Sequence, residues 1–344
     1  MTRDVCIVGA GAAGAGAAYA LRDTNSNVTI LEKSRGVCGR AATRRKNGCR
    51  YDHGANYIKN HDQRTTQLIR DLGEDGLVDV EKPVWTFDGD GVISTGDARD
   101  QYKWSWTEGI TQLAKRLLAQ TDAAVERETQ VAAIDHNPDT GYWSVVDATG
   151  TRRGPFDVVL LTPPAPQTAA ILTETGWGNQ CMVGLREAIG SVEYRTIRTI
   201  VLHYPFEREE PWYALVNTDK EHDIGWVARE ECKDGHVPDG ESLLVVQLSP
   251  EWSTEHYDDP LSEVAPDVAD MVAALLDDDR LRDPDWVDDQ GWRYALPNGV
   301  ANREIIRRGE PNGLYFAGDW TVGEGRVHAA LWSGIEAGER IANG

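Results

Sequence analysis

The sequence is poor in lysine and acidic overall. Among its 344 residues, 35 are Lys or Arg and 56 are Asp or Glu, which gives a net charge of −21. Only eight of the basic residues are lysines. A surface this acidic repels phosphate backbones and anionic lipid, so we expect neither nucleic acid nor a membrane as a partner.

The sequence also lacks paired cysteines, clustered histidines and long apolar runs. Its five cysteines include no C-x-x-C pair, and its eight histidines show no metal-binding spacing. We therefore expect no disulfide framework and no metal site. Apolar runs such as Val158–Leu161 are far too short to cross a bilayer.

One apolar stretch, Val5–Leu21, follows Arg3 as it would in a secretory signal. Asp4 and the spaced glycines argue against that interpretation. We expect a soluble, cytoplasmic protein that acts on a small-molecule substrate, and the sequence leaves its oligomeric state open. Because the acidic residues are spread along the whole chain, we hypothesise a halophilic surface adapted to high salt; an ordinary acidic protein is the alternative.

The residues that are present begin with a short strand followed by a glycine-rich turn. Asp4–Val8 has the length and apolarity of a buried parallel strand, and it leads directly into G-x-G-x-x-G. Gly9 permits the tight turn, Gly11 allows a pyrophosphate to approach, and Gly14 allows the next helix to pack closely. A chance Gly/Ala-rich helix is the alternative.

An alanine-rich helix at about Ala12–Arg22 and a second strand at Val28–Leu31 complete the unit. The helix N-terminus offers N–H groups and a partial positive charge to a phosphate. Glu32 ends the second strand, where a carboxylate accepts hydrogen bonds from a ribose. Strand, glycines, helix, strand and terminal acid together predict a dinucleotide-binding unit.

A second motif follows this unit. Cys38-Gly39-Arg40 places a guanidinium where it can meet a phosphate. The segment Tyr51–Ile58 is expected to be one short strand, and its Gly54-Ala55 pair lets a flat ring lie close to the backbone. Together with Glu32, these segments resemble the FAD-binding half of the flavin amine-oxidase superfamily.

The resemblance implies an α/β fold, in which a Rossmann-type FAD-binding domain is interleaved with an α+β substrate domain on a mostly antiparallel sheet. We expect residues 1–58, 105–164 and 290–344 in the FAD-binding domain, and residues 59–104 and 165–289 in the substrate domain. In monoamine oxidases the corresponding C-terminal segment carries a cysteine linked to the flavin, and here that segment, Val327–Leu331, has no cysteine. The resemblance therefore implies a non-covalent FAD.

The chain is expected to return to the cofactor at its end. Asp319 follows a short strand and can bind the ribityl hydroxyls, and the helix beginning at Arg326-Val327 can face the flavin. A purely structural C-terminal helix is the alternative. The expected cofactor-binding residues are Gly9, Gly11, Ala12, Ala13, Gly14, Glu32, Lys33, Ser34, Gly39, Arg40, Gly54, Ala55, Asn56, Tyr57, Val131, Thr162, Gly318, Asp319, Arg326 and Val327.

Three segments of the middle region are similar to the renalase-like branch of the superfamily: Gly225–Arg229, Val246–Ser253 and Gln290–Ala295. That similarity implies hydride transfer from a 2- or 6-dihydro isomer of NAD(P) to flavin N5, with O2 as electron acceptor and H2O2 as product. Two alternatives remain: a flavin-dependent amine oxidase, and a non-catalytic FAD-binding protein that transfers electrons or serves as a scaffold.

No catalytic base can be assigned from the sequence. The candidate substrate-face residues are Tyr57, Trp292, Arg293 and Tyr294, although aromatic packing explains the aromatic ones almost as well. Arg293 could instead steer an anionic substrate. His53 and His328 lie in the flavin motifs, where a structural role is more common than proton transfer. We also expect one strand at Val125–Ile134 and a helix at Pro266–Leu276.

Overall fold

The computed structural model describes residues 2–96, 101–178 and 181–344, which form two compact units. Unit 1 contains Met1–Arg40, Leu113–Tyr194 and Leu296–Gly344, and unit 2 contains Ala41–Gln112 and Arg195–Ala295. Compared with the expected domains, residues 41–58, 105–112 and 290–295 lie in unit 2 and residues 165–194 lie in unit 1. The assignment of cofactor and substrate domains stays a prediction.

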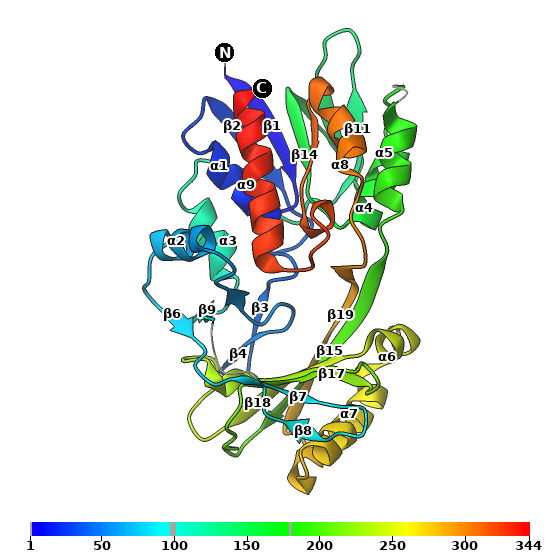
Figure 1. Cartoon of the computed structure of the whole chain (residues 1–344). Coiled ribbons are helices and arrows are strands. Elements are labelled where there is room, and N and C mark those ends of the chain that lie inside the picture. Colours follow the sequence, from blue (N-terminus) through cyan, green and yellow to red (C-terminus); the bar gives the residue numbers. More distant parts are fainter. Residues whose placement is uncertain (1, 97–100, 179–180) are drawn as a thin grey trace. The chain divides into compact units, whose positions relative to one another are not determined.

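Unit 1 is built on a five-stranded parallel sheet in the order β10-β2-β1-β14-β20 (Figure 1). Each of the three central strands is short and almost wholly buried at its carboxyl end, as expected for a sheet covered on both faces. The strands are β1 (Arg3–Val8), β2 (Ser26–Leu31), β10 (Ala124–Glu126), β14 (Val158–Leu161) and β20 (Leu314–Phe316).

Two helices, α1 (Ala12–Leu21) and α9 (Val327–Asn343), pack side by side in unit 1 (Figure 1). Small residues bring their backbones together: a Cβ added to Gly334 would lie 1.9 Å from the Ala13 carbonyl oxygen, and one on Gly16 would lie 2.7 Å from that of Leu331. This close contact fixes the C-terminal helix against the helix that follows the glycine-rich turn.

A second layer of unit 1 is a three-stranded antiparallel sheet with helices beside it. Its core includes Val8, Val131, Trp143, Leu161 and Leu185, which form one apolar cluster. The strands of this sheet are β11 (Val131–His136), β12 (Trp143–Asp147) and β13 (Arg152–Phe156), and the helices beside it are α4 (Ala165–Thr173), α5 (Cys181–Gly190), α8 (Arg303–Ile306) and η3 (Arg307–Asn312). Unit 1 also contains η4 (Asp319–Thr321), which contacts α9, and most of α3 (Gln112–Leu118).

Unit 2 is built on a seven-stranded, mostly antiparallel sheet in the order β19-β15-β18-β17-β16-β7-β8, in which β16 and β7 pair in parallel. Its strands are β7 (Val84–Phe87), β8 (Ile93–Ser94), β15 (Tyr194–Tyr204), β16 (Ala214–Asn217), β17 (Ile224–Arg229), β18 (Ser242–Leu248) and β19 (Trp286–Pro297). Smaller sheets join β3 (Thr43–Lys46) to β4 (Cys49–Asp52), and β5 (Ile58–Lys59) to β9 (Lys103–Trp106) and β6 (Leu77–Asp79).

The helices of unit 2 include α2 (Gln63–Asp71), α6 (Pro250–Glu255), α7 (Leu261–Leu275), η1 (Glu230–Cys232) and η2 (Asp279–Arg282). The amphipathic helix α7 buries Val264, Val268 and Val272 against the sheet core. It begins five residues before the expected start at Pro266, which lies within the helix. In the described ranges, no helix has both the length and the apolarity needed to span a membrane.

The α/β class, with a parallel Rossmann-type sheet and a second, mostly antiparallel sheet, is confirmed. Two expected strands are wrong. Val125–Ile134 divides into β10 and β11 in different sheets, because the backbone turns at Glu128, whose φ is +54°. Tyr51–Ile58 divides into β4 and β5, because the chain leaves the ladder after Asp52, whose carbonyl accepts a hydrogen bond from Asn56 Nδ2 at 2.6 Å.

Candidate functional site

The glycine-rich turn has the backbone geometry that its sequence predicts. Gly9 has φ +99°, in the region that favours glycine. A Cβ on Gly14 would lie 2.0 Å from the Gly9 carbonyl oxygen, so only glycine lets α1 start this close to β1. Thr162, at the end of β14, donates its hydroxyl to the Val8 carbonyl at 2.7 Å and so joins the next strand to this turn.

Space for a ligand opens beside Gly11. A Cβ placed there would have no protein atom within 4 Å, in contrast to Gly9 and Gly14. Gly11 also stands at the N-cap of α1, where no side chain caps the helix. An open face at an uncapped helix N-terminus suits the pyrophosphate of a dinucleotide, and Ala12 and Ala13 are the first residues of that helix.

Glu32 is 6% exposed and sits at the carboxyl end of β2. One carboxylate oxygen accepts a hydrogen bond from Ala10 N and the other from Ser34 N, each at 2.7 Å. Each oxygen has further lone pairs, so the carboxylate can hold the turn and still accept a ribose hydroxyl. Its role as a ribose ligand stays a prediction.

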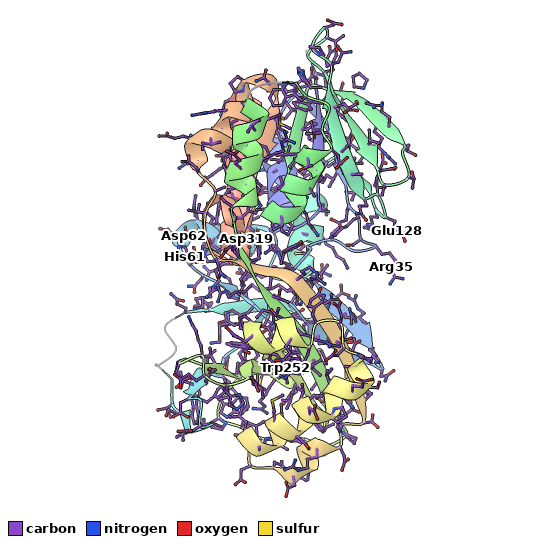
Figure 2. All side chains as sticks on the ribbon, turned by 90° about the vertical axis from the view of Figure 1, so that its right-hand side faces the viewer. Arg35, His61, Asp62, Glu128, Trp252 and Asp319 are labelled. Carbon is purple, nitrogen blue, oxygen red and sulfur yellow. The ribbon has the colours of Figure 1, made fainter. Side chains whose placement is uncertain are left out.

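A cavity of about 540 Å³ lies next to Glu32, within the usual size range of ligand sites. Lys33 and Ser34, both expected to contact the cofactor, line it. Arg35 and Glu128 also line it, and Figure 2 shows them on the same side of the unit. Val131 begins β11 directly after the lining residue Gln130, so its backbone is near this cavity and its side chain is buried in the core.

Arg40 and Asp319, far apart in the chain, form a two-pronged ion pair in unit 1. Arg40 Nη1 and Nη2 each donate to one Asp319 oxygen at 2.8 Å, and Asp319 is 3% exposed. Burial lowers the pKa of Arg40, but Asp319 and Tyr194 raise it by more, so the guanidinium stays charged. Gly39, which precedes Arg40, has φ +57° and approaches Gly11 closely.

The C-terminal segment brings a second uncapped helix N-terminus into unit 1. Gly318 N donates to Ser333 Oγ at 2.8 Å, which ties the loop before Asp319 to α9. Arg326 is the extended N-cap of α9 and Val327 its first residue, and no side chain caps this end. The arrangement gives α9 an N-terminus that can meet negative charge, as the sequence predicts.

The remaining expected cofactor residues, Gly54, Ala55, Asn56 and Tyr57, lie in unit 2 between β4 and β5. Gln247 Nε2 donates to the Gly54 carbonyl at 2.6 Å, and Asn56 caps the Asp52 carbonyl. These bonds hold the segment outside the ladder with its small residues half-exposed.

Tyr57 belongs to an aromatic group with Tyr213 and Trp226. The ring centroids are 6.1 to 6.4 Å apart. Tyr213 Oη and Trp226 Nε1 are buried without a hydrogen-bond partner among the described residues. Burial raises the pKa of Tyr213, so its hydroxyl remains a donor. The group thus contains two buried donors without partners beside three aromatic rings, and a hydrogen-bond acceptor on a small organic molecule would satisfy such donors.

Three of the candidate substrate-face residues lie on β19, and their side chains extend from both of its faces: Trp292, Arg293 and Tyr294. Trp292 stacks on His53 at 5.3 Å and donates its Nε1 to the His53 carbonyl at 3.1 Å. Arg293 points the other way, because side chains alternate along a strand: its guanidinium lies 4.1 Å from the Tyr257 ring centre. Tyr294 shares the face of Trp292. The structure therefore groups Trp292 with the His53 segment and separates Arg293 from it.

The structure gives His53 no support as a proton carrier near neutral pH. Burial, followed by the nearby Arg44, lowers the pKa of His53 to about 4, so the ring is neutral at pH 7. His328 is buried in the first turn of α9, with Nε2 3.5 Å from a Glu324 oxygen. A base stays unassigned.

A buried ionic network that no sequence motif predicts lies next to His53 and includes its neighbour Asp52. Lys233 Nζ lies 2.8 Å from Asp52 Oδ2 and 2.8 Å from Glu230 Oε1, and all three side chains have 0% exposure. His236 contacts Glu230 at 2.7 Å and the Trp106 carbonyl at 2.8 Å. Asp52 lies in the Tyr51–Ile58 motif segment, whereas Glu230 and Lys233 lie far along the chain, so the sequence does not connect them.

Comparison with known proteins places these features in a family. Residues 7–72 match the profile of an NAD(P)-binding Rossmann-like domain, and residues 79–342 match that of flavin-containing amine oxidoreductases. The chain therefore belongs to the flavin-containing amine oxidoreductase family. It is an enzyme family whose cofactor is a flavin, and the open turn at Gly11, the buried Glu32 and the adjoining cavity fit FAD.

A short stretch of this chain matches a plant enzyme. A stretch of 69 residues is 38% identical to protoporphyrinogen oxidase 2, chloroplastic/mitochondrial, of Arabidopsis thaliana, and covers 20% of this chain and 14% of that protein. The chain thus matches about a seventh of that relative's length. That match concerns a short stretch and leaves the substrate open.

Three solved structures share the fold at 14% sequence identity. A candidate protoporphyrinogen oxidase from Exiguobacterium sp. 255-15 aligns over 100% of this chain and 98% of its own, with a TM-score of 0.77. Putrescine oxidase bound to putrescine aligns over 100% and 98%, with a TM-score of 0.75. A fatty acid isomerase from P. acnes aligns over 97% of both chains, with a TM-score of 0.70.

Proposed function

We propose that this chain is an FAD-dependent amine oxidase that acts on a small amine. The observation that carries the proposal is the pair of buried, unpartnered donors, Tyr213 Oη and Trp226 Nε1, beside the Tyr57 ring in a chain of the flavin-containing amine oxidoreductase family. A neutral amine nitrogen accepts a hydrogen bond, so it satisfies a donor that nothing in the described protein satisfies.

The cofactor would be held by the residues of unit 1. Gly11 and the N-terminus of α1 suit its pyrophosphate, Glu32 its ribose, and the cavity lined by Lys33 and Ser34 its adenosine end. Bound FAD would supply the redox chemistry, as the acceptor of a hydride from the substrate and the carrier of its electrons to O2. In balance, the amine loses a hydride from carbon and a proton from nitrogen to become an imine, and O2 becomes H2O2.

The residues of unit 2 bind and orient the substrate in this proposal. The rings of Tyr57, Tyr213 and Trp226 exclude water from the alkyl part of the amine. Lys233 holds Asp52 and Glu230 and so anchors the segment that carries Tyr57. The net charge of −21 attracts an amine in its cationic form to the molecule before it loses its proton.

A dihydronicotinamide isomer is the second candidate substrate. The observation in its favour is that Trp226 and Trp292 lie within segments similar to the renalase-like branch. The charge of the chain opposes it, because NAD(P) isomers carry phosphates and the protein is strongly acidic.

Anaerobic flavin reduction separates the two candidates. The FAD-loaded protein is mixed with putrescine and simple aryl-alkyl amines in one series, and in another with borohydride-reduced NAD⁺, which contains the dihydro isomers. We expect the visible flavin band to bleach with an amine. If only the isomers bleach the band, the substrate is a dihydronicotinamide and the amine proposal is wrong. A purified protein that binds no FAD would overturn both candidate functions.

A further inference from the structure

Unit 2 contains a second cavity, of about 900 Å³, which the proposed oxidation does not use. Six of the side chains that line it are carboxylates: Glu207, Glu209, Glu210, Glu231, Asp239 and Glu241. Two of them are neutralised by arginines, since Arg229 pairs with Glu231 and Arg208 with Glu210. The excess of negative charge makes the cavity attractive to cations.

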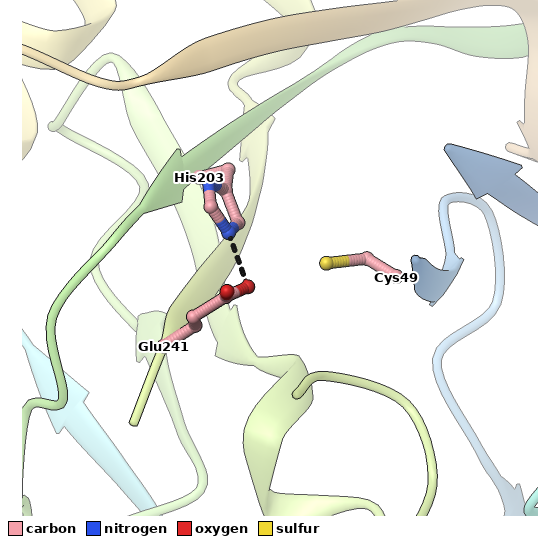
Figure 3. A group of neighbouring side chains, drawn as sticks. All are labelled: Cys49, His203 and Glu241. Carbon is pink, nitrogen blue, oxygen red and sulfur yellow. Dashed lines mark hydrogen bonds and ion pairs between the residues drawn. The ribbon is translucent and has the colours of Figure 1, made fainter. Parts of the chain in front are cut away.

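Glu241 connects this cavity to a buried cysteine and a buried histidine. His203 Nε2 lies 2.9 Å from Glu241 Oε2, and the Cys49 sulfur, the His203 nitrogen and the Glu241 oxygen all lie within 4.8 Å of one another. Cys49 is 1% exposed and His203 is 4% exposed. Figure 3 shows the Cys49 sulfur directed toward the His203–Glu241 pair.

Three separate strands create this group. Cys49 begins β4, His203 lies near the end of β15, and Glu241 directly precedes β18. β15 and β18 pair antiparallel with His203 opposite Leu243. Glu241 is two residues before Leu243, so its side chain lies on the same face and diagonal to His203. No spacing rule along the sequence reveals such a site, and the expectation of no metal rested on spacing alone.

Two residues next to β15, Asp285 and Trp286, lie against the His203 ring. Its Nδ1 lies 3.4 Å from Asp285 Oδ2, and the Trp286 ring stacks on it at 4.8 Å with an interplanar angle of 10°. A carboxylate behind a histidine sets the tautomer that leaves the other nitrogen free to bind a metal. No hydrogen bond joins Asp285 to His203 Nδ1 at this distance, so Asp285 takes the positioning role after a small shift of its side chain toward Nδ1.

We propose that Cys49, His203 and Glu241 bind one zinc ion, with Asp285 as the positioning residue. A sulfur, an imidazole nitrogen and a carboxylate oxygen are the ligands that Zn²⁺ takes, whereas Mg²⁺ and Ca²⁺ prefer oxygen alone. Glu241 is one-third exposed and lines the acidic cavity, so a water from the cavity can complete a four-coordinate site.

The distances are compatible after small side-chain shifts. Zinc bonds of about 2.0 to 2.3 Å in a tetrahedron place the ligand atoms roughly 3.3 to 3.8 Å apart. The His203–Glu241 separation of 2.9 Å therefore widens slightly, and separations up to 4.8 Å close by about 1 Å. The Cys49 thiol releases its proton when its sulfur binds the zinc ion, so the ligand is a thiolate.

A second group in unit 2 has similar ligands but already contains its cation. Asp52, Glu230 and His236 also lie close together, yet the Lys233 ammonium is 2.8 Å from both carboxylates and wholly buried with them. The Lys233 ammonium therefore supplies the positive charge that a metal ion would otherwise bring to this group. In the part of unit 2 that the structure describes, only the Cys49 group combines a thiol with an imidazole and a carboxylate facing a cavity.

Zinc content of the full-length, FAD-loaded protein tests the proposal. A chain without a histidine tag is stripped with EDTA, given ZnCl₂, desalted and analysed for metal, and its zinc absorption edge is recorded. We expect one zinc per chain with one sulfur and two or three nitrogen or oxygen neighbours. Substoichiometric zinc in the wild-type chain, or an absorption spectrum without sulfur, overturns the proposal even if no variant can be made.

Matched variants locate the site. Cys49→Ser should lower zinc affinity by at least tenfold, and Asp285→Asn by roughly 10- to 100-fold. Cys232→Ser is the control, because Cys232 lines the same cavity outside the group and should bind zinc as the wild type does. Equal zinc binding by the Cys49→Ser and Cys232→Ser variants contradicts the assignment. The flavin band and circular dichroism check folding, and the result is independent of the proposed oxidation.

Discussion

Arg40 and Asp319 meet through two parallel hydrogen bonds of 2.8 Å each, although they belong to opposite ends of the sequence. The ion pair joins the segment after β2 to the segment before α9, both within unit 1. Asp319 is almost fully buried, whereas the Arg40 side chain is 28% exposed. The pair therefore couples the two ends of the chain that the sequence assigns to FAD.

Replacing Arg40 by Met should destabilise the protein by about 2 to 4 kcal/mol, because it leaves the Asp319 carboxylate buried without its partner. FAD content after purification should fall as well. Arg40→Lys keeps the charge but makes one hydrogen bond in place of two, so an intermediate loss is expected. Urea unfolding and the ratio of flavin to protein absorbance measure both effects; equal stability of Arg40→Met and wild type would refute the coupling.

Gly334→Ala should destabilise the protein by about 3 kcal/mol or more, because the new Cβ would lie 1.9 Å from the Ala13 carbonyl oxygen and force α9 away from α1. The matched control is Gly184→Ala in α5, where the Cβ would meet only Ile305 at 3.7 Å. That change should be neutral or stabilise by up to about 1 kcal/mol, since alanine favours a helix. Denaturation midpoints decide between these expectations, and similar losses in both variants would contradict the packing argument.

His53 should make stability depend on pH between 6.5 and 4. Burial lowers the pKa of His53 from 6.5 to about 4, so the unfolded chain takes up a proton first as the pH falls. The stabilisation is complete above pH 6.5 and is lost progressively as the pH drops toward 4, by roughly 3 kcal/mol in total. His53→Gln cannot take up this proton, so the difference in unfolding free energy between it and the wild type should shrink over that range. Parallel pH profiles would show that His53 is not the cause.

Trp226 and Arg293 should differ in their effect on substrate. Trp226→Leu removes a buried donor and a wall of the aromatic group, so the rate of anaerobic flavin reduction by an amine should fall at least about tenfold at unchanged flavin content. Arg293→Gln should change it by less than about twofold, because the guanidinium lies over Tyr257 on the opposite face of β19. If the reduction rate of the Arg293→Gln variant falls more than this, Arg293 does contact the substrate.

Much of unit 1 follows from local sequence. The G-x-G-x-x-G turn, the strands around it and the terminal Glu32 are adjacent in the chain, and each has a backbone or packing requirement that few residues satisfy. The structure gives Gly9 its positive φ and Glu32 its backbone partners, as such a turn requires. The break between β10 and β11 is harder to predict, because the apolar pattern of Val125–Ile134 continues across the turn at Glu128.

The candidate substrate residues were only partly accessible from sequence. Tyr57 and Trp292 come from recognisable motifs, whereas Tyr213 and Lys233 lie in segments with no chemical pattern of their own. Arg293 was grouped with its neighbours in the sequence, and strand alternation places it on the other face. Proximity along the chain was a poor guide wherever a strand reverses the direction of successive side chains.

The sequence by itself determined the glycine-rich turn, the α/β class and the acidic character of this protein, because each depends on local backbone requirements or on composition. Only the tertiary structure decided that Arg40 meets Asp319, that Lys233 lies between Asp52 and Glu230, and that Cys49 meets His203 and Glu241. Those contacts join segments far apart in the chain. Strand pairing and packing bring them together, and neither spacing nor periodicity along the sequence records that outcome.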